Sequence, residues 1–439
     1  MKKIIYQYVC LIFCLTTACS TPSLLTICAP EYAGDTCQLY CSHRSEMIIL
    51  DSKGSAQIEL MPFMTFGMIQ MKSNGLRFNF YSGQGDLTIC INKNDSISFK
   101  GEHAVASDYY RTQKYPYLTW YPLESAGKEE LQTYLAAYSD TLNQILLSSG
   151  VEDPEFIRSQ QEDFKYSVEI FRALFYFDKN LMTQEDIEYF DSLFMEDENL
   201  LSSKNYAYAM YRYPKELILY QQKDDHRLPF ESMRDILDYY VKNYKSAAIR
   251  EIAIHQLALD YISEHGNDGY LDDVYRANVS DSALLKDYVE ISRIWDYFWS
   301  EKACAAIHAT NLLGETFDFN RYKGKYLLID VWATWCKPCT REQKLMFEIE
   351  PEFENKEIEF VTLSCDKYRK LWEKYCTEHE MGNKNHYNTR EMNALFEQLA
   401  IRFIPRFILF DPEGKLLSAN FFKPSNDKFK FILNRLLTK

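Results

Sequence analysis

Two cysteines separated by two residues are the pair in this 439-residue chain best suited to chemistry. Cys336 and Cys339 enclose Lys337 and Pro338 in the tetrapeptide C-K-P-C. This spacing lets two thiols close a small ring without moving the backbone, which a reversible disulfide requires. The thiolate is the reacting form, and unpaired N–H groups at the start of a helix stabilise it. At a helix start, the pair would therefore be suited to thiol–disulfide exchange.

Two other uses of such a pair are half of a zinc site and an inert structural disulfide. A zinc site needs a second pair of ligands, and the chain has no other C-x-x-C and no H-x-x-x-H. One further group of cysteines and histidines has a spacing that fits no common metal site: Cys365, Cys376, His379 and His386. We therefore expect no metal and no cofactor, and we favour the redox interpretation.

The residues around the pair predict a buried strand followed by a helix. Residues 326–331 are mostly aliphatic or β-branched and contain no turn former. Pro338 suits a first helical turn, where its missing N–H is no loss, and residues 340–344 continue the helix. We expect Cys336 to be the exposed thiol at the helix start and Cys339 to lie one turn deeper. Cys336 is therefore the predicted attacking thiol, and Cys339 the resolving thiol.

Residues 327–339, L-L-I-D-V-W-A-T-W-C-K-P-C, resemble the active-site segment of the thioredoxin superfamily. Residues 314–325 resemble the N-terminal hairpin of its TlpA/ResA type. Asp330 lies on the strand where this family has a buried carboxylate. The resemblance implies that Cys336 attacks a partner disulfide while Asp330 accepts and returns the proton of Cys339.

A second segment, residues 400–410, resembles the cis-proline loop of the same family. The resemblance implies that the Ile404–Pro405 bond is cis and faces the cysteine pair. The sequence departs from the family at Phe403, where Gly is common, and at Arg406, which is often Thr. Because of these departures, the resemblance does not identify the substrate. The resemblance implies substrate contacts by residues beside the pair and on this loop: Trp335, Lys337, Pro338, Ile404 and Pro405.

The N-terminus has the layout of an export signal. Lys2 and Lys3 precede an apolar run at residues 4–15 that is too short to cross a bilayer as a helix. A small residue followed by Cys19 resembles a bacterial lipobox, which implies that Cys19 is acylated and becomes the mature N-terminus. Ser20 resembles the second residue of lipoproteins sorted to an outer membrane. We expect a signal peptide at residues 1–18, a tether at 19–25 and a lipid-anchored protein in the cell envelope, at the outer membrane and facing the periplasm.

Composition and patterning predict a multidomain globular chain. Its net charge of −14 argues against binding nucleic acid or an anionic membrane through charge. At 46% apolar residues, 439 residues are ample for more than one core. We predict an N-terminal small β-sandwich, a central all-α domain and a C-terminal α/β thioredoxin fold. Their expected bounds are residues 26–104, 105–309 and 310–439.

Turn and capping signals support the two N-terminal domains. In the first, D-S-K-G at residues 51–54 and N-G at 74–75 predict β-hairpins. In the second, T-Q-E-D at 183–186 and Ser246 predict helix starts. We interpret the many Tyr and Phe residues at helical spacing as core, although a peptide-binding or partner surface would use the same residues.

The remaining cysteines of the expected mature chain do not predict a pairing. Setting aside Cys19, Cys336 and Cys339, an odd number remains, so at least one is free or intermolecular. The sequence is compatible both with disulfides between these cysteines and with buried free thiols. These residues are Cys28, Cys37, Cys41, Cys90, Cys304, Cys365 and Cys376.

The function we predict is disulfide exchange on exported proteins. Pro338 and Asp330, with no His inside the motif, resemble reductases more than oxidants. The expected partners are envelope proteins that carry disulfides or thiols, together with a membrane electron donor for the reductive direction. The alternative is a lipid-anchored binding or scaffold protein that uses the thioredoxin-like domain as a docking platform. Replacing both Cys336 and Cys339 distinguishes the two hypotheses. An oxidoreductase would lose the capture of partners, whereas a binding or scaffold protein would keep it.

Overall fold

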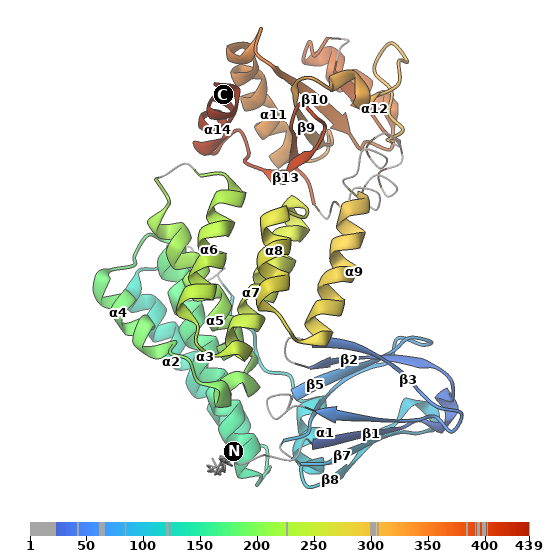
Figure 1. Cartoon of the computed structure of the whole chain (residues 1–439), viewed down its shortest axis with the longest axis vertical. Helices are drawn as coiled ribbons and strands as arrows, with labels where there is room; N and C mark the ends of the chain where they lie inside the picture. Colours follow the sequence, from blue (N-terminus) through green and yellow to red (C-terminus); the bar gives the residue numbers. More distant parts are fainter. Residues whose placement is uncertain are drawn as a thin grey trace, which may run out of the picture. The chain divides into compact units, whose positions relative to one another are not determined.

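The computed structural model describes most of the chain beyond its N-terminal segment (Figure 1). The expected signal peptide, Cys19 and most of the tether lie outside the described residues. In the described part, no helix is both long enough and apolar enough to span a membrane. The described residues are 23–438, without 42–43, 61–65, 84, 120–122, 124, 225–226, 299–303, 305–306, 383–384, 391, 393–395, 397–400 and 402.

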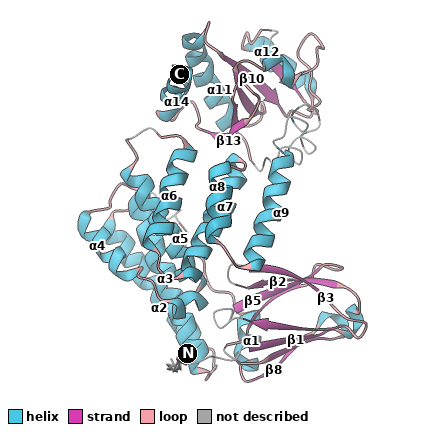
Figure 2. Ribbon diagram, in the orientation of Figure 1, coloured by secondary structure: helices cyan, strands magenta, loops and turns pink. Residues whose placement is uncertain are grey.

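The chain divides into two compact units. The first comprises residues 1–42, 46–115 and 144–160 and holds most of the β-structure N-terminal to residue 104. The second comprises residues 43–45, 116–143 and 161–439 and holds most of the helices together with the C-terminal α/β domain (Figure 2).

The N-terminal β-structure consists of two four-stranded sheets with one shared core, which confirms the predicted sandwich. One sheet has the strand order β4-β1-β7-β8 and the other β3-β2-β5-β6. Residues of both sheets meet in one apolar cluster, for example Ile27 and Ile89 from the first sheet with Leu39, Ile69 and Phe80 from the second. The strands are β1 (Ser23–Cys28), β2 (Thr36–Cys41), β3 (Arg44–Ile49), β4 (Ser55–Leu60), β5 (Phe66–Met71), β6 (Arg77–Tyr81), β7 (Leu87–Ile91) and β8 (Ile97–Gly101).

Only one of the two predicted hairpins forms. Strands β5 and β6 pair antiparallel across the N-G turn, where Gly75 adopts a φ of 73°. The hairpin predicted at residues 51–54 is wrong, because β3 and β4 belong to different sheets. The turn itself is present, with Asp51 accepting hydrogen bonds from Lys53 N–H and Ser55 N–H. It carries the chain from one layer of the sandwich to the other.

The middle of the chain is helical, and its aromatic residues form core, as predicted. Buried phenols donate hydrogen bonds to backbone carbonyls, for example Tyr240 to Tyr211 and Tyr275 to Leu284. The predicted start at Thr183 is a capping box with Asp186. The helices are α1 (Ala104–Thr112), α2 (Lys128–Leu147), α3 (Pro154–Asp178), α4 (Gln184–Leu193), α5 (Lys204–Gln221), α6 (Pro229–Asn243), α7 (Ala247–His265), α8 (Gly269–Asn278) and α9 (Ser282–Phe298).

The C-terminal domain is the predicted α/β thioredoxin fold. Its sheet has the order β11-β10-β9-β12-β13; β9, β10 and β11 run parallel, and β12 pairs antiparallel with β9 and with β13. Helices α11 and α14 pack in one apolar cluster with β9, β10 and β12, and α12 lies on the other side of the sheet (Figure 1). The elements are β9 (Tyr326–Trp332), α11 (Lys337–Ile349), β10 (Ile358–Ser364), α12 (Arg369–Glu378), β11 (His386–Asn388), β12 (Arg406–Phe410), β13 (Leu416–Phe421) and α14 (Lys428–Leu437).

One expectation about this domain is not met as stated. The hairpin expected at residues 314–325 is reduced to one antiparallel bridge, between Thr310 and Thr316, followed by a 3-10 turn at Phe319–Tyr322. Asn311 closes this bend, because its side-chain oxygen accepts hydrogen bonds from the N–H groups of Leu313 and Glu315. The sequence also predicts a helix at residues 393–400, but almost all of these residues lie outside the described part of the chain, so this helix stays a prediction.

Candidate active site

The cysteine pair lies where strand β9 turns into helix α11, as the sequence predicts. Cys336 is the N-cap of α11, and Pro338 lies in its first turn. Cys336 and Cys339 form a disulfide, with their Cα atoms 5.2 Å apart. The N–H of Cys339 donates a hydrogen bond to Sγ of Cys336 over 3.3 Å. The sulfur of Cys336 therefore accepts a hydrogen bond from an N–H group of the first helical turn. This hydrogen bond favours the thiolate form of Cys336 after reduction.

The prediction that Cys336 is exposed is wrong for the disulfide form. Its exposed fraction is 7%, and that of Cys339 is 0%. The sulfur of Cys336 is turned toward the helix N–H groups that it caps rather than toward solvent. The expected order of access nevertheless holds, since only Cys336 retains exposed surface. Its neighbour Trp335 is 62% exposed, and Lys337 is exposed as well.

Asp330 is fully buried in the middle of the sheet. It lies on β9 opposite Thr362 of β10 and Phe407 of β12. In the described part of the chain, neither carboxyl oxygen of Asp330 has a hydrogen-bond partner. Burial raises the pKa of Asp330 well above its usual range, and the charge of Glu342 acts in the same direction. Asp330 therefore has the properties of a buried group that binds and releases a proton at a pH well above the usual range of a carboxyl group.

Gln343 of α11 is a site residue that sequence reasoning missed. It is 1% exposed, and its side chain opposes the rise in the pKa of Asp330 by favouring the charged form. Its amide nitrogen has no hydrogen-bond partner among the described residues. Gln343 follows Cys339 by four residues, so both lie on one face of α11. This i, i+4 spacing is the signal that could have found it.

A buried carboxylate on a neighbouring loop holds the segment before Cys336. Asp366 is 1% exposed and accepts hydrogen bonds from Thr334 N–H (2.9 Å), Thr334 Oγ1 (2.7 Å) and Ser364 Oγ (2.8 Å). The amide of Asn388 donates to the Asp366 carbonyl over 3.0 Å. The ends of three parallel strands thus meet at Asp366, whose carboxylate holds Thr334, two residues before Cys336. No sequence motif indicated this contact.

The cis-proline loop lies at the same edge of the sheet. The Ile404–Pro405 peptide bond is cis, as predicted. Arg406 pairs with Val331 near the end of β9, so the preceding loop residues lie at the edge where Cys336 follows. Pro405 is buried, Ile404 half-buried and Phe403 53% exposed. A contact of Ile404 or Pro405 with substrate stays a prediction, as it does for Trp335, Lys337 and Pro338.

Arg406, a departure from the family pattern, does not face solvent. It is 6% exposed, and its Nη1 donates to the carbonyl of Ala419 on β13 over 3.3 Å. Its guanidinium lies 4.3 Å from the ring centroid of Phe403. Phe403 rather than Arg406 is therefore the departure that changes the surface.

The remaining thiols of this domain are inert by burial. Sγ of Cys365 donates to the carbonyl of Trp332 over 3.2 Å, and burial raises the pKa of both Cys365 and Cys376 to about 12. No group of His, Cys, Asp and Glu able to hold a metal occurs among the described residues.

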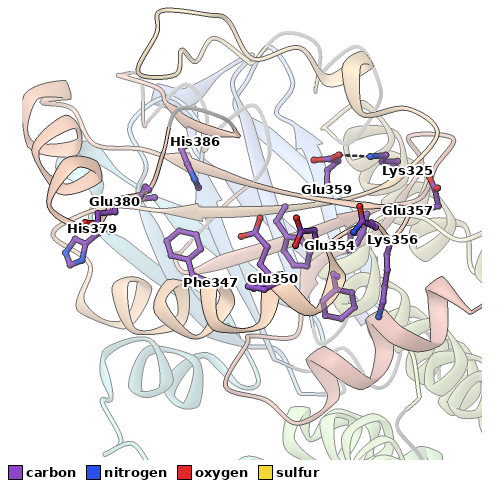
Figure 3. Close-up of a pocket in the computed structure, with 16 residues that line it drawn as sticks. Lys325, Phe347, Glu350, Glu354, Lys356, Glu357, Glu359, His379, Glu380 and His386 are labelled. Carbon is purple, nitrogen blue, oxygen red and sulfur yellow. Dashed lines mark hydrogen bonds and ion pairs between the residues drawn. The ribbon is translucent and has the colours of Figure 1, made fainter.

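A pocket in the same domain is distinct from the cysteine site. The cavity has a volume of about 890 Å³, and its lining includes Phe347, Glu350 and His386, which Figure 3 draws as sticks. It also includes Lys325 and Glu359, which form an ion pair of 2.8 Å at the start of β9 and β10. Cys336 follows the opposite end of β9, and the lining of the pocket includes neither Cys336 nor Cys339.

Comparisons with known proteins agree with this geometry. Residues 324–416 match the sequence profile of a family described as Thioredoxin-like. ResA, a thiol-disulfide oxidoreductase of Bacillus thuringiensis subsp. konkukian (strain 97-27), is 25% identical over 108 residues, which are 25% of this chain and 61% of that protein. ResA of Geobacillus thermodenitrificans (strain NG80-2) is 29% identical over 130 residues, 28% of this chain and 74% of that protein.

Among solved structures, the thioredoxin domain of a thiol-disulfide oxidoreductase from Bacteroides vulgatus is 26% identical. The match covers 30% of this chain and 92% of that one, with a TM-score of 0.28. The chain spans 61% of the length of the first ResA relative above. With the disulfide at the start of α11, the sequence matches identify the C-terminal part of the chain as a thioredoxin-like, ResA/TlpA-like thiol-disulfide oxidoreductase domain.

Proposed function

We propose that the protein reduces disulfides of exported proteins in the cell envelope through Cys336 and Cys339. The observation that carries this proposal is the disulfide at the N-terminus of α11, on the strand–helix turn that follows Asp330, whose buried carboxyl group has no hydrogen-bond partner among the described residues. Such a pair can exist as dithiol and as disulfide in one backbone geometry. A structural disulfide needs no buried proton acceptor on the strand that leads to it.

The reaction proceeds in two exchanges. The thiolate of Cys336 attacks one sulfur of a substrate disulfide, which forms a mixed disulfide and releases the other substrate sulfur as thiolate. Cys339 then loses its proton to Asp330 and attacks Sγ of Cys336, which releases the second substrate sulfur. The substrate gains two electrons and leaves as two thiolates, which take up one proton from Asp330 and one from water, and the domain returns to the disulfide form.

Continued turnover needs a dithiol that reduces the Cys336–Cys339 disulfide. We assign this role to a membrane electron donor. The exposed indole of Trp335 and the exposed ring of Phe403 supply apolar surface at the reacting edge, which suits a protein substrate better than a small thiol.

For location, we propose a lipid anchor at Cys19 that holds the protein at the outer membrane, facing the periplasm. The support is the signal-peptide layout and the small residue before Cys19. The wild type should partition into detergent and incorporate labelled palmitate, and Cys19→Ala should do neither. A wild-type protein that stays in the aqueous phase with its N-terminus beyond Cys19 would refute the anchor.

Reduction of insulin by dithiothreitol tests the catalytic proposal. The protein should accelerate it, and Cys336→Ser/Cys339→Ser should not. The alternative, a scaffold that uses this domain only for docking, predicts that the double variant captures partners as well as the wild type does.

A further inference from the structure

Two cysteines of the N-terminal sandwich lie side by side on adjacent strands. Strands β1 and β7 pair in parallel, and Cys28 is the direct partner of Cys90 in their register. Neighbouring strands lie about 4.8 Å apart, and disulfides form between Cα atoms roughly 4.4–6.8 Å apart. Register alone therefore places these two residues within disulfide range.

Both thiols are on the outer face of the sheet. Side chains alternate between faces along a strand, and directly paired residues share a face. Ile27 and Ile89, the residues just before the two cysteines, are fully buried in the core between the sheets. Cys28 and Cys90 are half-buried and point away from that core. The pair is thus reachable by small thiols and disulfides.

The other described free thiols lack both properties. Each of them is buried, and burial raises the pKa of Cys37 to about 11 and that of Cys304 to about 12. Cys365 and Cys376 of the C-terminal domain are buried in the same way. Among the described free cysteines, only Cys28 and Cys90 combine a partner in register with access from solvent.

We propose that Cys28 and Cys90 form a second dithiol–disulfide couple, separate from Cys336 and Cys339. One thiolate attacks a small disulfide such as oxidised glutathione, which forms a mixed disulfide and releases one glutathione thiolate. The second thiolate attacks the mixed disulfide and releases the second glutathione. The protein loses two electrons and two protons, and glutathione gains them. The chain then holds two couples that each carry two electrons.

The test uses the full chain equilibrated in glutathione buffers from reducing to oxidising, quenched with acid, alkylated and analysed by peptide mass spectrometry. Peptides joined through Cys28 and Cys90 should increase at least about tenfold across the series and should disappear with dithiothreitol. The Cys336–Cys339 peptide in the same digest reports independently on the proposed active site. The two peptides therefore separate the two claims. Cys28 and Cys90 can stay unjoined while Cys336 and Cys339 respond to the buffer, and Cys28 and Cys90 can join while Cys336 and Cys339 do not respond.

Two variants complete the test. Cys28→Ser should leave Cys90 alkylated or bound to glutathione but joined to no other cysteine, and Cys90→Ser should do the same for Cys28. In the wild type, Cys365 and Cys376 serve as internal controls and should stay reduced throughout. The proposal is overturned when Cys28 and Cys90 remain unjoined in the most oxidising buffer. It is equally overturned when either of them joins Cys37, Cys41 or another chain instead.

Discussion

The hydroxyl group of Thr334 donates a hydrogen bond of 2.7 Å to the buried carboxylate of Asp366, and the N–H of Thr334 donates a second one of 2.9 Å. Asp366→Ala leaves both donors without this acceptor and frees the segment that leads to Cys336. We expect a loss of unfolding free energy of ~1–3 kcal/mol and a slower disulfide exchange. Denaturant unfolding and stopped-flow exchange with a peptide disulfide measure the two effects.

A second aspartate provides the matched control for this prediction. Asp411 also accepts a backbone N–H, from Lys415 at 2.7 Å, in the turn between β12 and β13. Asp411→Ala should reduce stability but leave the exchange rate unchanged. If the two alanine variants exchange disulfides equally fast, Asp366 supports only the fold.

Asp330→Asn should stabilise the folded protein, and the gain should grow with pH. Burial raises the pKa of Asp330, so the folded protein holds this proton more tightly than the unfolded chain does. The wild type therefore loses stability as the pH rises from about 4 through the raised pKa, by up to ~1.4 kcal/mol per pH unit. The variant lacks this loss. Urea unfolding at a series of pH values measures the difference, and a constant difference would show that Asp330 is not titrating.

The same substitution should slow the resolving step near neutral pH. Without the carboxylate, Cys339 has no internal base to take its proton. Decay of a preformed mixed disulfide at Cys336, followed between about pH 6 and 8, measures this step directly. Equal decay rates in the two proteins would leave Asp330 with a structural role alone.

Oxidation of Cys28 and Cys90 should stabilise the sandwich. Joining β1 to β7 restricts the unfolded chain, which typically contributes ~2–4 kcal/mol to the unfolding free energy. The measurement compares unfolding of the oxidised and reduced forms of Cys336→Ser/Cys339→Ser, which isolates the second pair. Cys28→Ser in the same background is the control and should unfold alike in both conditions. A disulfide form no more stable than the dithiol would contradict this prediction.

The features predicted correctly depend on residues close together in sequence. The strand, the turn and the helix around Cys336 follow from one short segment, and the helix cap at Thr183 follows from four residues. The cis bond before Pro405 and the buried carboxyl group of Asp330 came from family resemblance, which carries spatial information that local patterns lack.

Apart from Gln343, which a local i, i+4 spacing could have indicated, the features that were missed depend on pairing between distant segments. The partnership of Cys28 with Cys90 exists because β1 and β7 are neighbours in one register, which no local pattern specifies. The contact between Thr334 and Asp366 joins two loops at the ends of parallel strands. The wrong hairpin at residues 51–54 has the same origin, since a turn signal does not say which sheet the next strand joins.

The most direct test of the central claim asks which sulfur of the pair attacks. Cys336 is the helix N-cap and retains exposed surface, whereas Cys339 is fully buried. Cys339→Ser should attack but not resolve, so it should accumulate mixed disulfides with partner proteins that dithiothreitol releases. Cys336→Ser should trap none, because the hydroxyl group does not attack and Cys339 is out of reach. Equal trapping by the two variants would contradict the assignment of Cys336 as nucleophile.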